Sequence, residues 1–305
     1  MPPVTCVLHH HIGAEGPFEQ GLGIASTPQA YAAQIEWMAA RYDIISLDQL
    51  LSGDLPRRPL LLTFDDAFRS VVDVVRDVLA PRGLPCVYFV NPGLLEPEAI
   101  SLDSTLAWAA NTVGLERLCA ALDLPVRDSV GQLVVQDMAA HGATRRAEIR
   151  DKVLADFGPP DLAARAPLMV PEDLAELVSL GAEIGNHTLS HVHCRSLSSS
   201  EIETEIVASK ARLETLCGHP VRAFSVPYGH EADLTETVLE ALRASGHAAI
   251  FLVHARSNRW QAAPDVWYRT SLHDEAPATL PRKLAHLPFL RSLKHQAGKL
   301  SSWRS

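Results

Sequence analysis

The sequence has few of the features that mark secreted, membrane-spanning or disulfide-stabilised proteins. Its five cysteines are odd in number and no two form a C-x-x-C pair, so free thiols in a reducing compartment are expected. No apolar run approaches the ~20 residues that span a bilayer. The first residues, MPPVTCVLH, lack the basic and apolar regions of a signal peptide. We therefore expect a cytoplasmic protein.

The charge balance and the missing motifs exclude further classes. The net charge of −9 argues against nucleic-acid binding, which needs a basic surface. The glycines at 21–23 (GLG) lack the third glycine and the preceding strand of a dinucleotide site. The chain has no G-x-x-x-x-G-K-[ST] and no G-x-S-x-G sequence, so nucleotide hydrolysis and serine esterase chemistry have no support.

Short apolar segments alternate with segments of helical period, which is typical of a largely parallel α/β fold. We predict strands at residues 4–9, 44–47, 60–64, 86–90, 183–186, 223–226, 248–253 and 266–271. Helices are predicted at residues 27–41, after 66 as far as 79, and at 171–180, 200–216 and 234–245. Residues 100–170 show helical patterns near 102–122 and 145–156 without strands between them. The whole pattern predicts a distorted (β/α) barrel of about seven strands over residues 1–275 with a helical insertion, followed by a tail at 276–305.

Two groups of potential metal ligands follow predicted strands. Asp65 and Asp66 come directly after residues 60–64, where one carboxylate can bind a metal ion and the other can accept a proton. His187 and His191 follow residues 183–186, and their four-residue spacing brings two imidazoles to one side of a turn. Each pattern alone also fits a helix cap or surface histidines. Because no cysteine ligand is nearby, an Asp-His-His site with open positions is implied, which is typical of catalytic ions.

A third segment, residues 224–229 (FSVPYG), ends another predicted strand, and its Pro-Tyr-Gly turn can present a backbone N–H to a developing oxyanion, although ordinary turns have the same composition. The sequences TFDD at 63–66, HTLSH at 187–191 and PYG at 227–229 occur in the order found in polysaccharide deacetylases, also called the NodB-homology or fourth carbohydrate esterase family. The chain resembles this family over most of residues 4–100 and 171–272. Residues 8–12 (LHHHI) are similar to the Y-H-x-[IV] opening of one subgroup.

The resemblance implies a metal-dependent hydrolase that removes an N-acetyl group from an amino sugar. It implies that Asp66, His187 and His191 hold a divalent ion, with zinc expected first and cobalt or nickel as alternatives. Asp65 is then the general base that activates a water, and the backbone N–H of Tyr228 stabilises the tetrahedral intermediate.

Two positions depart from the family pattern. Many members have an arginine at the place of Ser225 that orients the base, and here Arg269 is expected to do so instead. The usual C-terminal L-x-x-H acid has no clean counterpart. The resemblance to the subgroup with permuted motifs assigns the general acid to His10, with His254 and His273 as weaker candidates.

Other interpretations stay open at this point. The same site serves a related amidase acting on a small non-sugar amide, and a non-catalytic carbohydrate-binding relative is the third hypothesis. The tail at 276–305 has six Lys or Arg and no Asp or Glu, interleaved with leucines, so it either packs on the barrel or makes peripheral contact with an anionic membrane. A cytoplasmic location favours a nucleotide-linked or lipid-linked sugar precursor as substrate.

Overall fold

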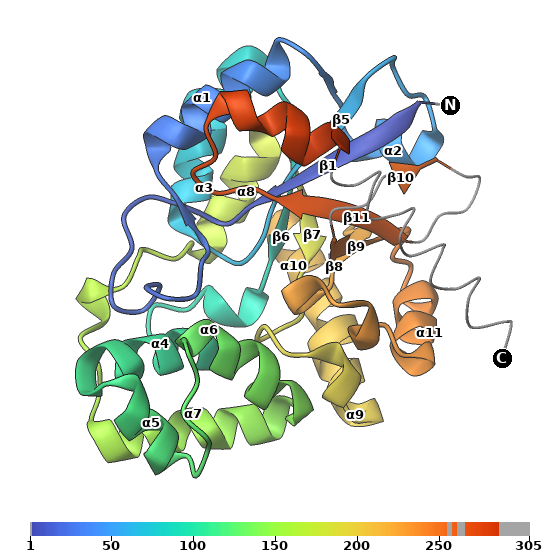
Figure 1. The fold of residues 1–305 in the computed structure, drawn as a ribbon. Helices are drawn as coiled ribbons and strands as arrows, with labels where there is room; N and C mark the ends of the chain where they lie inside the picture. The colour runs from blue at the N-terminus through green and yellow to red at the C-terminus, as the bar shows by residue number, and fades with distance from the viewer. Residues whose placement is uncertain (1, 255–257, 261–265, 287–305) are drawn as a thin grey trace, which may run out of the picture.

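The computed structural model describes residues 2–254, 258–260 and 266–286, which form a closed barrel of parallel strands surrounded by helices (Figure 1). The barrel strands are β1 (Pro3–His9), β5 (Pro59–Phe64), β6 (Cys86–Val90), β7 (Ala182–Asn186), β8 (Ala223–Ser225), β9 (Ala249–Val253) and β11 (Val266–Ser271). β1 pairs in parallel with β5 on one side and with β11 on the other, and this closes the barrel. The predicted distorted (β/α) barrel of seven strands is confirmed.

Four further strands have two residues each. β4 (Asp43–Ile44) joins the start of β5, β10 (Asn258–Arg259) pairs antiparallel with β1, and β2 (His11–Ile12) pairs with β3 (Ala25–Ser26). Strands this short give no alternation of apolar and polar residues, so β2, β3 and β10 were not predicted, and β4 overlaps the predicted strand 44–47 at Ile44 alone.

Helices cover the outside of the barrel. They are α1 (Pro28–Ala39), α2 (Leu47–Ser52), α3 (Arg69–Val74), α8 (Pro171–Ser179), α9 (Ser199–Ile202), α10 (Ser209–Cys217) and α11 (Glu236–Ala244). α3 continues through a π turn to Leu79, and a π turn also joins α9 to α10. The prediction of a strand at 44–47 was wrong at its end, because Ser46 and Gln49 form a capping box that starts α2 at Leu47.

Between β6 and α8 the chain forms helices α4 (Leu102–Val113), α5 (Leu115–Ala121), α6 (Val130–Gln132) and α7 (Ala143–Phe157). Figure 1 shows these helices in green, gathered beside the barrel. Gly114, with φ of 91°, divides the predicted helix 102–122 into α4 and α5. The insertion has an apolar core of its own, built around Leu106, Leu118 and Leu133. Among the described residues no helix is long and apolar enough to cross a membrane.

The described beginning of the basic tail packs on the barrel. Leu280 and Leu284 are buried in the same apolar cluster as the strands, and Lys283 forms an ion pair with Glu275. These two leucines are therefore not available to a membrane surface. The rest of the predicted amphipathic segment, including Leu287, Phe289, Leu290 and Leu293, lies outside the described residues.

His9, at the end of β1, is a buried histidine whose ring lies between Tyr31 and Phe64. Neither ring nitrogen has a hydrogen-bond partner in the described structure, and burial lowers the pKa of His9 from 6.5 to about 3. The folded protein therefore binds fewer protons here than the unfolded chain, so this contribution to stability is complete above pH 6.5 and falls as the pH drops towards 3.

We predict that His9→Leu makes the protein less sensitive to acid. Between pH 7.5 and pH 5 the wild type should lose about 2 kcal/mol more unfolding free energy than the variant, measured by chemical denaturation. The exposed His219→Leu is the matched control and should follow the wild type. If the unfolding free energies of the wild type and His9→Leu changed equally with pH, protonation of His9 would not destabilise the folded protein.

Candidate active site

The candidate site lies at the rim where the barrel strands end at their carboxyl termini. Strand pairing extends one residue past β5 and β7: the Asp65 N–H donates to the His9 carbonyl, and the His187 N–H to the Val90 carbonyl. The side chains that follow these strands therefore start from fixed backbone positions on one rim, as is usual for active sites of (β/α) barrels.

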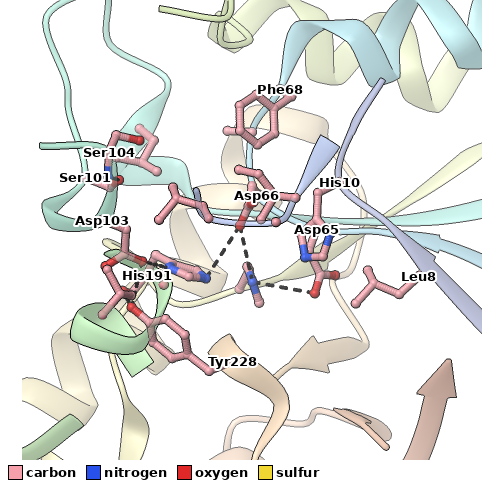
Figure 2. A pocket seen from close by; sticks show the side chains of 18 of the residues that line it. Leu8, His10, Asp65, Asp66, Phe68, Ser101, Asp103, Ser104, His191 and Tyr228 are labelled. Atoms are coloured by element: carbon pink, nitrogen blue, oxygen red, sulfur yellow. Dashed lines mark hydrogen bonds and ion pairs between the residues drawn. The ribbon is translucent and has the colours of Figure 1, made fainter. Parts of the chain in front are cut away.

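Asp66, His187 and His191 converge on one point, and Figure 2 shows the labelled side chains of Asp66 and His191 turned towards each other. Asp66 Oδ1 lies 3.7 Å from His187 Nε2 and 3.6 Å from His191 Nε2. The potential ligand atoms of all three residues are within 4.8 Å of one another. The structure thus brings together the three residues predicted as metal ligands.

The two imidazoles are fixed through their other nitrogens. His187 Nδ1 donates to the Ser225 carbonyl at 2.8 Å, and His191 Nδ1 donates to Asp103 Oδ2 at 2.8 Å. Each Nε2 therefore faces Asp66, and in the neutral ring this nitrogen carries the lone pair. Burial lowers the pKa of His187 to about 4, although Asp65 and Asp66 act in the opposite direction. Burial is the largest single influence on His191 and opposes its charge, but the bond to Asp103 and the negative charges of Asp66 and Asp103 together outweigh it and raise the pKa of His191.

The turns that carry these residues are strained. Asp66, Thr188, His191 and Tyr228 all have positive φ values, between 60° and 76°. For non-glycine residues this costs about 1–3 kcal/mol each, and such strain is concentrated at functional sites. The strained turn at Thr188, and not a helical spacing, sets the two rings 5.1 Å apart.

Buried polar groups hold the turn after β7. Asn91 donates to the carbonyls of His187 and Thr188. Glu205 accepts from the N–H of Ser190 at 3.0 Å and from its hydroxyl at 2.8 Å. Neither contact could be predicted from a local sequence pattern, because the partners are distant along the chain.

Asp65 is buried beside Asp66 and His187 and is held by Arg269. Arg269, fully buried in β11, donates to Asp65 Oδ1 at 2.6 Å and to Oδ2 at 2.7 Å. The Ser225 hydroxyl donates to Oδ2 at 3.0 Å. Burial raises the pKa of Asp65, but the charge and hydrogen bonds of Arg269 together with the nearby His187 more than offset it, and the pKa lies well below its ordinary value. The expected contact between Arg269 and Asp65 is present in the structure.

A cavity of about 230 Å³ opens over these residues. The lining residues from the barrel rim include His10, Asp65, Asp66, His187, His191 and Tyr228, and those from the insertion include Ser101, Asp103, Ser104, Val134 and Val135. His10 lies near Asp65 in Figure 2, and its buried Nδ1 has no hydrogen-bond partner among the described residues. His254 and His273 are not among the residues that line the cavity.

Tyr228 takes part in the site through its side chain as well as its turn. Its ring stacks on His193 with centroids 3.7 Å apart, and its hydroxyl donates to Asp103 at 2.7 Å. Asp103 in turn forms an ion pair with Arg146. Sequence reasoning missed these partners. Asp103 looks like an ordinary acidic residue in the first turn of a helix, and no local pattern indicates that it faces the barrel.

The arrangement fits a divalent ion of the zinc class. One carboxylate and two neutral imidazole nitrogens are typical ligands of catalytic zinc, and three protein ligands leave positions open for water and substrate. Both histidines have the hydrogen-bonded Nδ1 that is usual for metal ligands. The cavity thus brings together Asp66, His187 and His191, which suit an ion, and the ionised carboxylate of Asp65.

This barrel, with carboxylates and histidines gathered on one rim, has the architecture typical of (β/α)-barrel enzymes. A family profile described as polysaccharide deacetylase matches residues 52–250, about two thirds of the chain. The chain belongs to the polysaccharide deacetylase family.

Solved structures share the fold at low sequence identity. The deacetylase PplD of Streptococcus pyogenes, solved in complex with acetate, is 15% identical with a TM-score of 0.61, and the match covers 93% of this chain and 99% of that one. IcaB from Ammonifex degensii is 16% identical with a TM-score of 0.58, covering 94% and 98%. A de-N-acetylase from Aggregatibacter actinomycetemcomitans is 14% identical with a TM-score of 0.61, covering 92% and 100%.

Proposed function

We propose that this protein is a divalent-metal-dependent de-N-acetylase acting on an amino sugar. The observation that carries the proposal is the cluster of Asp66, His187 and His191, with both histidines turned towards Asp66, beside the ionised Asp65. Family membership supports the deacetylase chemistry and a carbohydrate substrate.

Each residue of the site has a role in this proposal. Asp66, His187 and His191 would hold a divalent ion, which would supply polarisation of the acyl carbonyl and make water more acidic. Asp65 accepts the proton of the attacking water, and Arg269 holds its two oxygens in place. The backbone N–H of Tyr228 donates to the developing oxyanion. His10 gives a proton to the leaving amine, since it is the one candidate acid that lines the cavity.

The size of the cavity suits a small substrate or the terminal sugar of a chain. Its volume of about 230 Å³ is below the ~300–1,000 Å³ of drug-sized ligand sites, so it suits one sugar unit. Residues of the insertion line part of it. We infer that the substrate is a nucleotide-linked or lipid-linked amino sugar whose carrier extends out of the cavity. The acetate complex of PplD and the de-N-acetylase among the similar structures are consistent with release of acetate.

The proposal is tested by metal content and acetate release, measured on the same preparations. We expect about one zinc-class ion per chain in the wild type. Asp66→Ala should lose both the ion and the release of acetate from N-acetylated sugars. Asp73→Ala is the control, because Asp73 is a half-exposed carboxylate on α3 that pairs with Arg76 outside the cavity. It should keep both properties.

The substrate panel separates the possible activities. Acetate release from N-acetylhexosaminides, but not from simple amides, supports the sugar deacetylase. Turnover of non-sugar amides alone would identify a related amidase. Sugar binding without turnover at any loading of zinc, cobalt or nickel would contradict an enzymatic function.

A further inference from the structure

A buried carboxylate of the insertion, Asp103, contacts His191, one of the three proposed metal ligands. Asp103, on α4, is 6% exposed and lies 88 residues from His191 in the sequence. Its Oδ2 accepts from His191 Nδ1 at 2.8 Å and from the Tyr228 hydroxyl at 2.7 Å. Because an ionised carboxylate only accepts hydrogen bonds, the proton of His191 is on Nδ1, and Nε2 faces Asp66.

A second residue of the insertion holds Asp103. Arg146, on α7 and 3% exposed, donates to Asp103 Oδ1 at 2.7 Å, to the Tyr228 hydroxyl at 2.6 Å and to the His191 carbonyl at 3.3 Å. Buried ion pairs are weak contributors to stability, because desolvation of both charges offsets their attraction. Stabilisation of the fold therefore does not by itself explain why Asp103 and Arg146 are paired and buried here.

The two histidines of the cluster differ in what fixes them. His187 donates to a neutral carbonyl of the barrel, that of Ser225, whereas His191 donates to the charged carboxylate of Asp103. Hydrogen bonding of a metal-binding histidine to a carboxylate orients the ring and makes it a stronger ligand. The barrel alone thus fixes the orientation of the His187 ring, whereas the orientation of the His191 ring depends on the insertion.

We propose that the insertion completes the metal centre: Asp103 is the positioning residue for His191, and Arg146 is the positioning residue for Asp103. The inference rests on the proposed function, because it requires that Asp66, His187 and His191 hold an ion. It gives the insertion a role in ion affinity that is separate from shaping the cavity.

The test measures the zinc dissociation constant by competition with a chromophoric chelator, without any activity assay. Asp103→Asn should weaken zinc binding about 10–100-fold. This variant leaves Arg146 as an unpaired buried charge, so the double variant Asp103→Asn with Arg146→Gln is tested beside it. The double variant removes both charges, should fold with less loss of stability, and should bind zinc as weakly as the single variant.

The matched control is Asp137→Asn. Asp137 forms a bidentate ion pair with Arg127 within the same insertion and does not line the cavity. It should keep the zinc affinity of the wild type. Zinc binding by both Asp103 variants at wild-type strength would overturn the inference while leaving the proposed function intact. Equal weakening in Asp137→Asn would also overturn it, because the effect would then reflect folding of the insertion. A wild type that binds no zinc-class ion would refute both.

Discussion

Replacing Asp65 by Asn is expected to lower kcat/KM for acetate release by about 10²–10⁴-fold, the usual contribution of a general base. The metal content should stay at the wild-type level, because Asp66, His187 and His191 are unchanged. An amide cannot accept the proton of the attacking water, although it has almost the same shape as the carboxylate. Loss of activity with retention of the ion is thus the signature that separates the base from the ligands.

The substitution also removes the partner of a buried arginine, so a control for folding is needed. Asp173→Asn makes the same chemical change in another buried carboxylate, which pairs with Arg69 at 2.5 Å outside the cavity. It should keep wild-type activity. Both variants are assayed at a temperature at which circular dichroism shows them folded. An Asp65→Asn variant with activity near that of the wild type would remove Asp65 from the mechanism and leave the site without an identified base.

The barrel and the central residues of the site were predictable because their signals are local. β5 and β6 are buried at every position, and the sequence shows them as apolar segments in which Thr63 is the one polar residue. Asp65 directly follows β5 and His187 directly follows β7, and residues at the carboxyl ends of parallel strands must share one rim. The family motifs then indicated which side chains belong together.

The remaining parts of the site depend on contacts between distant segments, which no local pattern encodes. Asp103 and Arg146 come from two helices of the insertion and reach His191 only because that insertion packs over the rim. The positive φ at Thr188 is equally invisible, since a β-branched residue rarely adopts this conformation, and that of His191 follows from the same turn. Thr188 accepts from the His191 N–H at 3.1 Å, so the turn is stabilised by a contact that exists only once it has formed.

Arg269→Met is expected to destabilise the protein by about 3–5 kcal/mol, the usual cost of leaving one partner of a buried ion pair alone. Arg269 is fully buried, and its guanidinium lies 5.2 Å from the centre of the Phe89 ring and 5.9 Å from that of Phe251. Methionine retains the apolar contacts with these rings. The loss therefore reports the charge left on Asp65, and chemical denaturation at neutral pH measures it.

A double-mutant cycle identifies the cause. Asp65→Asn together with Arg269→Met removes both charges, so it should be more stable than Arg269→Met alone, and the two changes should not be additive. Additive losses would mean that Arg269 stabilises the barrel through packing and not through Asp65. Arg269→Lys completes the set: a lysine keeps the charge but cannot donate to both oxygens as a planar fork. It should keep more of the stability than Arg269→Met and still lose activity, because Asp65 is then charged but no longer held in one orientation.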